Sequence, residues 1–138
     1  MLMLAGLFSC VSNKNDEGIH FTTIGKGDYG MGSTQEIIIK TQDEWETLLT
    51  SLPKFDTDRF SETVIDFGKC QIISVFKSCP TGGWNVYVSS IKEYPYRIVV
   101  TVKVTAPKGA ATDGLTSIYH IIKMPVTAMP IEFSYLHF

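Results

Sequence analysis

The chain has 138 residues and a mass of 15.4 kDa, enough for one domain with one hydrophobic core. Hydrophobic residues make up 44% of it and charged residues 19%, a globular composition that excludes disorder throughout. The formal net charge is −2 and the 12 basic residues are scattered singly. We therefore expect no nucleic-acid partner, because no basic face is available to neutralise phosphates.

The first ten residues, MLMLAGLFSC, have the pattern of a bacterial lipoprotein leader. The apolar run Met1–Phe8 has the length of a signal-peptide core and is too short to span a bilayer, which needs about 20 apolar residues. Leu7-Phe8-Ser9-Cys10 then resembles the lipobox, whose cysteine is acylated and becomes the new N-terminus. We predict residues 1–9 to be signal peptide and Cys10 to be a lipid anchor in the bacterial cell envelope, on the periplasmic face or the cell surface. The anchor would be the only contact with the membrane.

One feature departs from this leader pattern. No lysine or arginine precedes the apolar run, although a signal peptide normally begins with positive charge. Either translation begins further upstream, or the resemblance is fortuitous and the run is a buried N-terminal strand. The cysteines favour the anchor, because their number is odd and lipidation of Cys10 leaves only Cys70 and Cys79. An extended segment separates these two by about 30 Å, too far for a disulfide, so we expect two buried thiols.

A polar tether over residues 10–18 is expected to lead into a single domain over residues 19–138. A first strand is predicted at Ile19–Ile24, followed by a turn-rich loop that contains Gly25-Lys26-Gly27-Asp28-Tyr29-Gly30. These residues fit the GxGxxG pattern of dinucleotide sites, in which the loop opens a helix. Here the loop leads into the β-type segment Glu36–Lys40, so we interpret it as a hairpin loop and expect no cofactor.

One amphipathic helix is predicted at about residues 41–52. Thr41-Gln42-Asp43-Glu44 is a capping box, in which Thr41 and Glu44 satisfy each other's backbone amides. The apolar residues that follow recur at helical spacing, and Pro53 ends the helix. The residues on this apolar stripe are Trp45, Leu48, Leu49 and Leu52.

The rest of the chain reads as short strands separated by turns. Ile98, Val100, Val102 and Val104 alternate with polar residues, which is typical of a half-buried strand. We therefore expect a mostly β (α+β) fold: an antiparallel β sandwich or partly open barrel with the helix on one side. The predicted strands are Cys70–Lys77, Trp84–Ile91, Tyr96–Thr105, Ser117–Lys123 and Ile131–Leu136, with loops at Cys79–Gly83, Pro107–Gly114 and Pro125–Pro130.

Three features then occur in order: GKCQIISVFKSCPTGGW at 68–84, an alternating valine strand ending in Ala106-Pro107, and TSIYHIIKMP at 116–125. Together they resemble the C-terminal domain family of the protease complex subunit PrcB, over about residues 36–133. The family's Thr-Gly-Gly-aromatic turn falls on Thr81-Gly82-Gly83-Trp84, where Trp84 replaces the more usual tyrosine. Its Thr-x-x-Tyr-x-x-x-Lys-x-Pro strand falls on Thr116, Tyr119, Lys123 and Pro125.

The resemblance implies a non-catalytic, lipoprotein-borne domain, whose namesake associates with and stabilises a secreted protease. We therefore expect a protein partner, with a secreted or surface protease as the class that the resemblance implies. Glycines allow a partner's backbone to approach closely, and tryptophan is a common interface anchor. The alternative is that the glycines only provide positive φ while Trp84 fills the core on the face of Val86 and Val88. The candidate contact residues are Thr81, Gly82, Gly83, Trp84 and Tyr119.

The histidines and cysteines of the chain suggest two possible arrangements, a metal site and a catalytic cysteine. If the last two strands form a hairpin, His120 and His137 lie opposite each other, but no further ligand with zinc-type spacing accompanies them. A nucleophilic Cys79 paired with His120 would need an electropositive setting and an orienting third group, and the sequence shows neither. We therefore expect neither a metal nor an enzyme, and interpret these histidines as edge-strand residues.

The sequence is also compatible with two functions other than protein binding. The runner-up is a small-molecule or glycan-binding module of the cell envelope that uses Trp84, Tyr87, Tyr94 and Tyr96. Exposure of these rings on one face would favour it, whereas burial would count against it. An adhesion or scaffold role without a discrete site is a third possibility.

Overall fold

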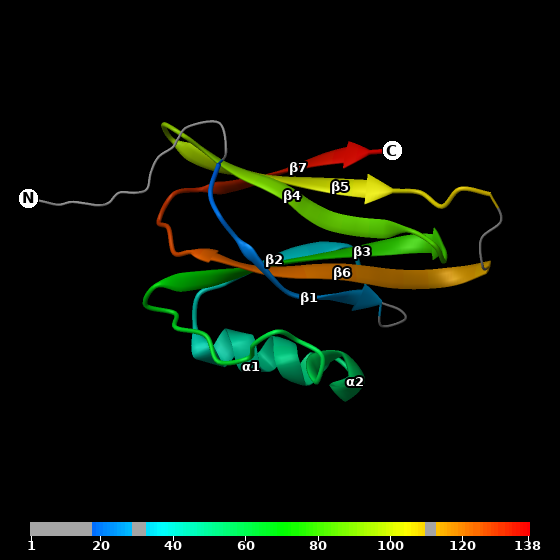
Figure 1. Cartoon of the computed structure of the whole chain (residues 1–138), viewed down its shortest axis with the longest axis horizontal. Coiled ribbons are helices and arrows are strands. Elements are labelled where there is room, and N and C mark those ends of the chain that lie inside the picture. The colour runs from blue at the N-terminus through cyan, green and yellow to red at the C-terminus, as the bar shows by residue number, and fades with distance from the viewer. Residues whose placement is uncertain (1–17, 29–32, 110–112) are drawn as a thin grey trace, which may run out of the picture.

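The computed structural model describes residues 18–28, 33–109 and 113–138, so the predicted signal peptide, Cys10 and most of the tether lie outside the described residues. Two β-sheets pack face to face, and two helices cover the outer face of one sheet (Figure 1). The mostly β fold is confirmed, and the sandwich is the correct one of the two expected architectures. No helix in the described ranges is long and apolar enough to cross a membrane.

The first sheet has the strand order β1-β6-β3-β2 and is antiparallel throughout, whereas the second has the order β4-β5-β7. In the second sheet β4 pairs with β5 in antiparallel fashion, but β7 pairs with β5 in parallel. The expectation of a wholly antiparallel sandwich is therefore wrong for the last strand. The elements are β1 (Thr22–Asp28), β2 (Gln35–Ile39), α1 (Gln42–Ser51), α2 (Lys54–Thr57), β3 (Cys70–Thr81), β4 (Asn85–Tyr94), β5 (Arg97–Thr105), β6 (Asp113–Pro125) and β7 (Ile131–His137).

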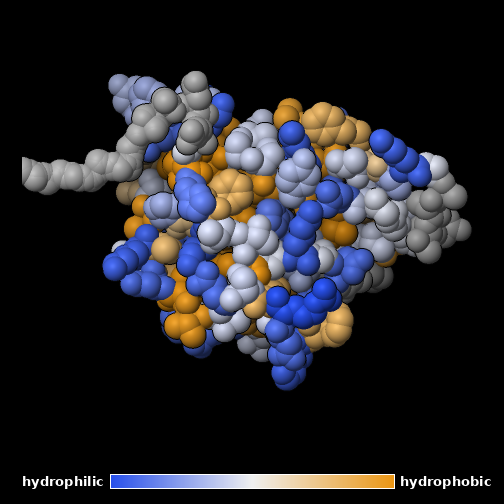
Figure 2. Space-filling view, viewed as in Figure 1, coloured by the Kyte–Doolittle hydropathy of each residue, from blue (hydrophilic) through white to orange (hydrophobic). Residues whose placement is uncertain are grey.

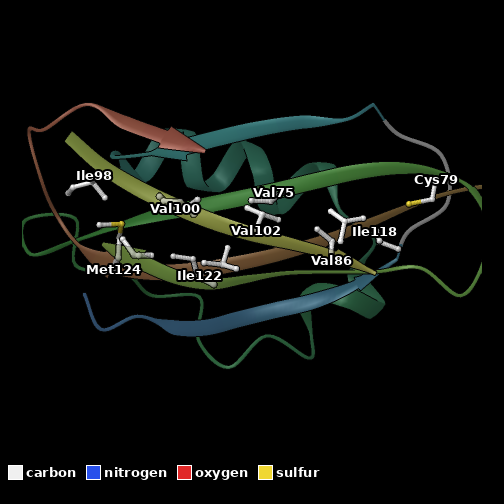
Figure 3. Close-up of a cluster of buried hydrophobic side chains, with 13 residues drawn as sticks. Val75, Cys79, Val86, Ile98, Val100, Val102, Ile118, Ile122 and Met124 are labelled. Carbon is white, nitrogen blue, oxygen red and sulfur yellow. The ribbon is translucent and has the colours of Figure 1, made fainter. Parts of the chain in front are cut away.

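A hydrophobic core fills the space between the two sheets, with side chains from β3, β4, β5 and β6 (Figure 3). The alternating valine strand behaves as its period predicts, because the four residues from Ile98 to Val104 at every second position are at most 1% exposed. Val86 and Val88 of β4 face the same core. The sequence pattern of β4 and β5 therefore determines which faces of the second sheet point inward.

A second core lies between the first sheet and the helices. The inner strands β3 and β6 contribute to both cores, because Ile73 and Ile122 face the second sheet while Ile72 and Ile121 face the helices. This two-sided burial explains why five of the seven residues of CQIISVF are apolar. Trp45 of α1 is fully buried at the centre of this second core, and its indole Nε1 donates to the Thr63 carbonyl at 2.8 Å.

Helix α1 confirms the prediction of an amphipathic helix, including its capping box. The Glu44 amide donates to Thr41 Oγ1 at 3.2 Å, and the Thr41 amide donates to Glu44 Oε1 at 3.2 Å. The Glu44 carboxylate also accepts from the Lys40 amide at 3.0 Å, and this bond is the main reason why the pKa of Glu44 is lowered, with a further contribution from Thr41. Pro53 ends α1 as expected, but it is also the N-cap of the short helix α2, which was not predicted.

The first strand differs most from its prediction. It was expected at Ile19–Ile24, but β1 begins at Thr22 and runs through Asp28, so that Gly25 and Gly27 lie in the strand and not in a loop. A Cβ at Gly25 would lie 2.3 Å from the Phe60 ring, and one at Gly27 would lie 3.3 Å from the Tyr119 hydroxyl. These two glycines therefore let aromatic rings pack on the β1 backbone, which explains the first half of the GxGxxG pattern, while its third glycine, Gly30, lies outside the described residues.

Candidate functional site

The Thr81–Trp84 turn, which joins β3 to β4, makes many contacts within the domain. Trp84 Nε1 donates to Thr81 Oγ1 at 3.1 Å, and Thr116 Oγ1 donates to the Thr81 carbonyl at 2.9 Å. Gly83 has φ of 85°, and a Cβ there would lie 2.9 Å from Cβ of Pro107. Because half-buried Trp84 also packs against the core between the sheets, these contacts favour the structural role for the turn.

Tyr119 faces the helix layer and is 1% exposed. Its ring lies against those of Phe76 and Phe60, with centroid distances of 5.7 and 6.4 Å. Burial is the main reason why the pKa of its hydroxyl rises to about 12. Tyr119 therefore belongs chiefly to the core, and little of its ring is accessible to a partner.

His120 joins the two sheets across one edge of the sandwich. The Val88 amide of β4 donates to His120 Nδ1 at 2.8 Å, so the ring proton lies on Nε2, which is 2.9 Å from Thr23 Oγ1 of β1. Burial and then the charge of Lys26 lower the pKa of His120 to about 4. The interpretation of His120 as an edge-strand residue is wrong, since β6 is an inner strand and the ring is 4% exposed.

The metal and nucleophile arrangements are not formed. His120 and His137 belong to different sheets, so the hairpin that would have placed them opposite each other does not exist. Among the described residues, no three potential ligands gather as a metal site would require. Cys79 lies opposite Thr116 in the β3–β6 register, four positions and about 13 Å along the strand from His120. Burial also raises the pKa of the Cys79 thiol, which is the opposite of activation.

Cys70 and Cys79 are both free thiols within β3. Cys79 is buried as expected, whereas Cys70 is only half-buried and lies at the start of the strand. An extended strand holds the two apart, as the length of the segment predicted.

A groove lies between the edge strands β1 and β4, on the side of the sandwich that His120 bridges. We call it the β1–β4 groove. It consists of two adjoining hollows of about 360 Å³ and 240 Å³, which share Lys26 and Asn85. In Figure 2 hydrophilic and apolar side chains mix on the face that carries β1 and β4. The larger hollow is lined by Phe21, Thr23, Lys26, Asn85, Tyr87, Val88 and His120, and the smaller by Lys26, Gly27, Asp28, Trp84, Asn85, Val86, Ile118 and Tyr119.

Lys26 is the cation of this groove. Its ammonium group lies 5.1 Å from the centre of the Tyr87 ring, a cation–π contact between β1 and β4. Partial burial lowers its pKa, and within the described ranges no carboxylate forms an ion pair with it. Sequence reasoning missed Lys26, because the pattern around it suggested a loop; its pairing with His120 across β1 and β6 depends on the tertiary fold.

The aromatic residues considered for glycan binding do not form one surface. Trp84 and Tyr87 are half-buried at the start of β4, whereas exposed Tyr94 and Tyr96 lie at the β4–β5 turn, about 23 to 33 Å away along the strand. Arg97 covers the Tyr94 ring at 4.9 Å. The geometry therefore gives no support to a common aromatic platform.

The fold and the groove define a class: a small β sandwich with a helical layer on one sheet and a recess between two strand edges. Residues 72–125 match the family described as PrcB C-terminal, and this segment runs from β3 through β6. The match confirms the family resemblance over this segment, which is shorter than the predicted range of about residues 36–133. No curated protein and no solved structure matches the chain.

Proposed function

We propose that this chain is a non-catalytic lipoprotein of the bacterial cell envelope whose β sandwich binds a protein partner. The observation that carries the proposal is the match to the PrcB C-terminal family over residues 72–125. This family suggests a protease complex, so a secreted or surface protease is the class of partner that we propose. The proposed role is to stabilise that partner.

The chemistry of the described residues supports binding over catalysis. Cys79 has a raised thiol pKa and lies at one end of the core between the sheets (Figure 3), where its 1% exposure leaves a substrate no access. Both ring nitrogens of His120 are engaged, one by the Val88 amide and one by Thr23. A general base needs a free nitrogen within reach of a substrate proton.

Binding of a protein partner is tested by crosslinking in the native cells, followed by purification of the intact chain through a C-terminal tag. We expect a second protein in a reproducible ratio to the chain, and a lower steady-state amount of that protein in cells that lack the chain. Cells with an untagged chain are the control. Recovery of the chain alone, with no other protein dependent on it, would contradict the proposal.

The anchor is tested by metabolic labelling with a palmitate analogue. The wild-type chain should incorporate the label and sediment with membranes, whereas a Cys10→Ser variant should lose at least about 90% of the label, because the labelled lipid is attached through the sulfur of Cys10. A Cys70→Ser variant is the matched control and should label like the wild type. Equal labelling of the wild type and the Cys10→Ser variant would show that Cys10 is not the lipidated residue.

A further inference from the structure

We propose that the β1–β4 groove binds a small organic monocarboxylate, whose carboxylate lies on Lys26 and whose apolar body contacts the rings of Phe21 and Tyr87. This inference goes beyond the proposed function and does not rest on it, because binding of a small anion requires no protein partner.

The larger hollow of the groove has the size of a small-molecule site and takes its walls from both sheets. Its volume is about 360 Å³, at the lower end of the usual range for such sites. Thr23 and Lys26 of β1 line one side, and Asn85 and Tyr87 of β4 line the other. The buried ring of His120 is hydrogen-bonded to both strands. The two walls are therefore held in a fixed relation, and the hollow exists before a ligand binds.

Lys26 brings to this hollow a cation without a counter-ion. Its ammonium group lies over the Tyr87 ring, and none of the ion pairs in the described ranges includes it. Burial lowers its pKa, and no carboxylate of the described residues offsets this effect. Asp28 borders only the smaller hollow. Because a partly desolvated cation gains a charge-assisted hydrogen bond when an anion enters beside it, the hollow favours an anion over a neutral or cationic ligand.

Two further donors line the same hollow. The Val88 amide donates to Nδ1 of His120, so Nε2 carries the proton and donates to Thr23 Oγ1. The Thr23 hydroxyl therefore keeps its own proton for an acceptor. The side-chain amide of exposed Asn85 is the second donor. Ammonium, hydroxyl and amide groups together suit the two oxygens of a carboxylate, which accept several hydrogen bonds.

Aromatic rings and the single cation define the rest of the ligand. Phe21, which precedes β1, packs against the core between the sheets, and Tyr87 is half-buried. An apolar group on these rings would bury hydrophobic area and shield the carboxylate on Lys26 from water. A second anionic group would find no second cation, because His120 is neutral and the other lining residues of this hollow are uncharged. The ligand is therefore a monocarboxylate with an apolar body.

The test titrates benzoate into the isotope-labelled full chain in a non-ionic detergent, with backbone amide chemical shifts as the readout. We expect saturable shifts at the amides of Lys26 and Tyr87 and none along β7, which lies outside the groove. Benzyl alcohol and benzylamine replace the carboxylate with a neutral and a cationic group. Both should bind at least about tenfold more weakly than benzoate, because neither places an anion on the ammonium group.

Variants test the role of Lys26. Lys26→Met keeps an unbranched side chain but removes the charge, and should weaken benzoate binding at least about tenfold. Asn85→Asp, at an exposed position, brings a carboxylate into the hollow and should also weaken it at least about tenfold. Lys103→Met is the matched control, because Lys103 also lies over an aromatic ring, that of Phe138, but outside the groove. Its affinity should stay within about twofold of wild type.

Three results would overturn the inference: no saturable shift at the groove, equal affinities for benzoate and benzyl alcohol, or unchanged affinity in a folded Lys26→Met variant. The comparison of ligands uses only the wild-type chain, so it decides the matter even where a variant does not fold. None of these results depends on recovery of a partner from cells. Failure of this inference and failure of the proposed function are therefore observed separately.

Discussion

Replacing Trp45 with alanine is expected to lower the free energy of unfolding by about 3 to 5 kcal/mol, the usual cost of truncating a buried tryptophan. Trp45 is fully buried between α1 and the first sheet, so truncation leaves a cavity that the surrounding strands cannot fill. It also removes the donor to the Thr63 carbonyl, which holds the segment after α2 against the helix. Urea denaturation followed by circular dichroism measures the difference.

Glu46→Ala is the control for this prediction, since Glu46 is the next residue on α1 and is exposed. Its loss should change stability by no more than about 0.5 kcal/mol, as expected for a surface position. A Trp45→Ala variant within about 1 kcal/mol of wild type would mean that α1 does not pack on the sheet as described.

The second large effect is a pH dependence that His120 confers on stability. The pKa of His120 in the folded state, about 4, lies below its ordinary value of 6.5, so the unfolded chain binds a proton more readily. The stabilisation is therefore fully present above about pH 6.5 and is lost as the pH falls toward 4. The expected loss over this range is about 2 to 3 kcal/mol.

A His120→Asn variant isolates this contribution, because the amide oxygen can accept from Val88 but does not titrate. The difference in unfolding free energy between wild type and variant should shrink by about 2 to 3 kcal/mol between pH 7 and pH 4. Exposed His137 provides the control, and His137→Asn should leave the wild-type profile unchanged. Parallel profiles for wild type and His120→Asn would show that His120 is not held neutral between the sheets.

Local sequence patterns correctly predicted those features that do not depend on contacts with distant parts of the chain. The capping box from Thr41 to Glu44 and the stripe from Trp45 to Leu52 determine α1 without reference to the rest of the chain. The alternation from Ile98 to Val104 determines the inward face of β5 in the same way.

Strand pairing could not be predicted, because the alternation of apolar and polar residues shows which face of a strand is buried but does not show which strand lies beside it. The parallel pairing of β7 with β5 separates His137 from His120, which a simple hairpin would have brought together. Gly25 and Gly27 looked like turn residues, and only the positions of Phe60 and Tyr119 explain why glycines occur in a strand.

The candidate site was predicted in part. The Thr81–Trp84 turn borders the groove through Trp84, so the sequence located one end of the recess. The sequence did not reveal the grouping of Lys26, Thr23 and His120. These residues become neighbours only because β1 pairs with β6 and the second sheet packs against the first. The pairing of Lys26 with the Tyr87 ring depends on the same long-range contact.

The central claim is that the β sandwich binds another protein. Native mass spectrometry of the assembly purified from membranes through the full-length chain tests it most directly. The account predicts a complex whose mass equals that of the chain plus a second protein in a whole-number ratio, and which dissociates into both. A mass accounted for by the chain alone, as a monomer or as copies of itself, would contradict the account.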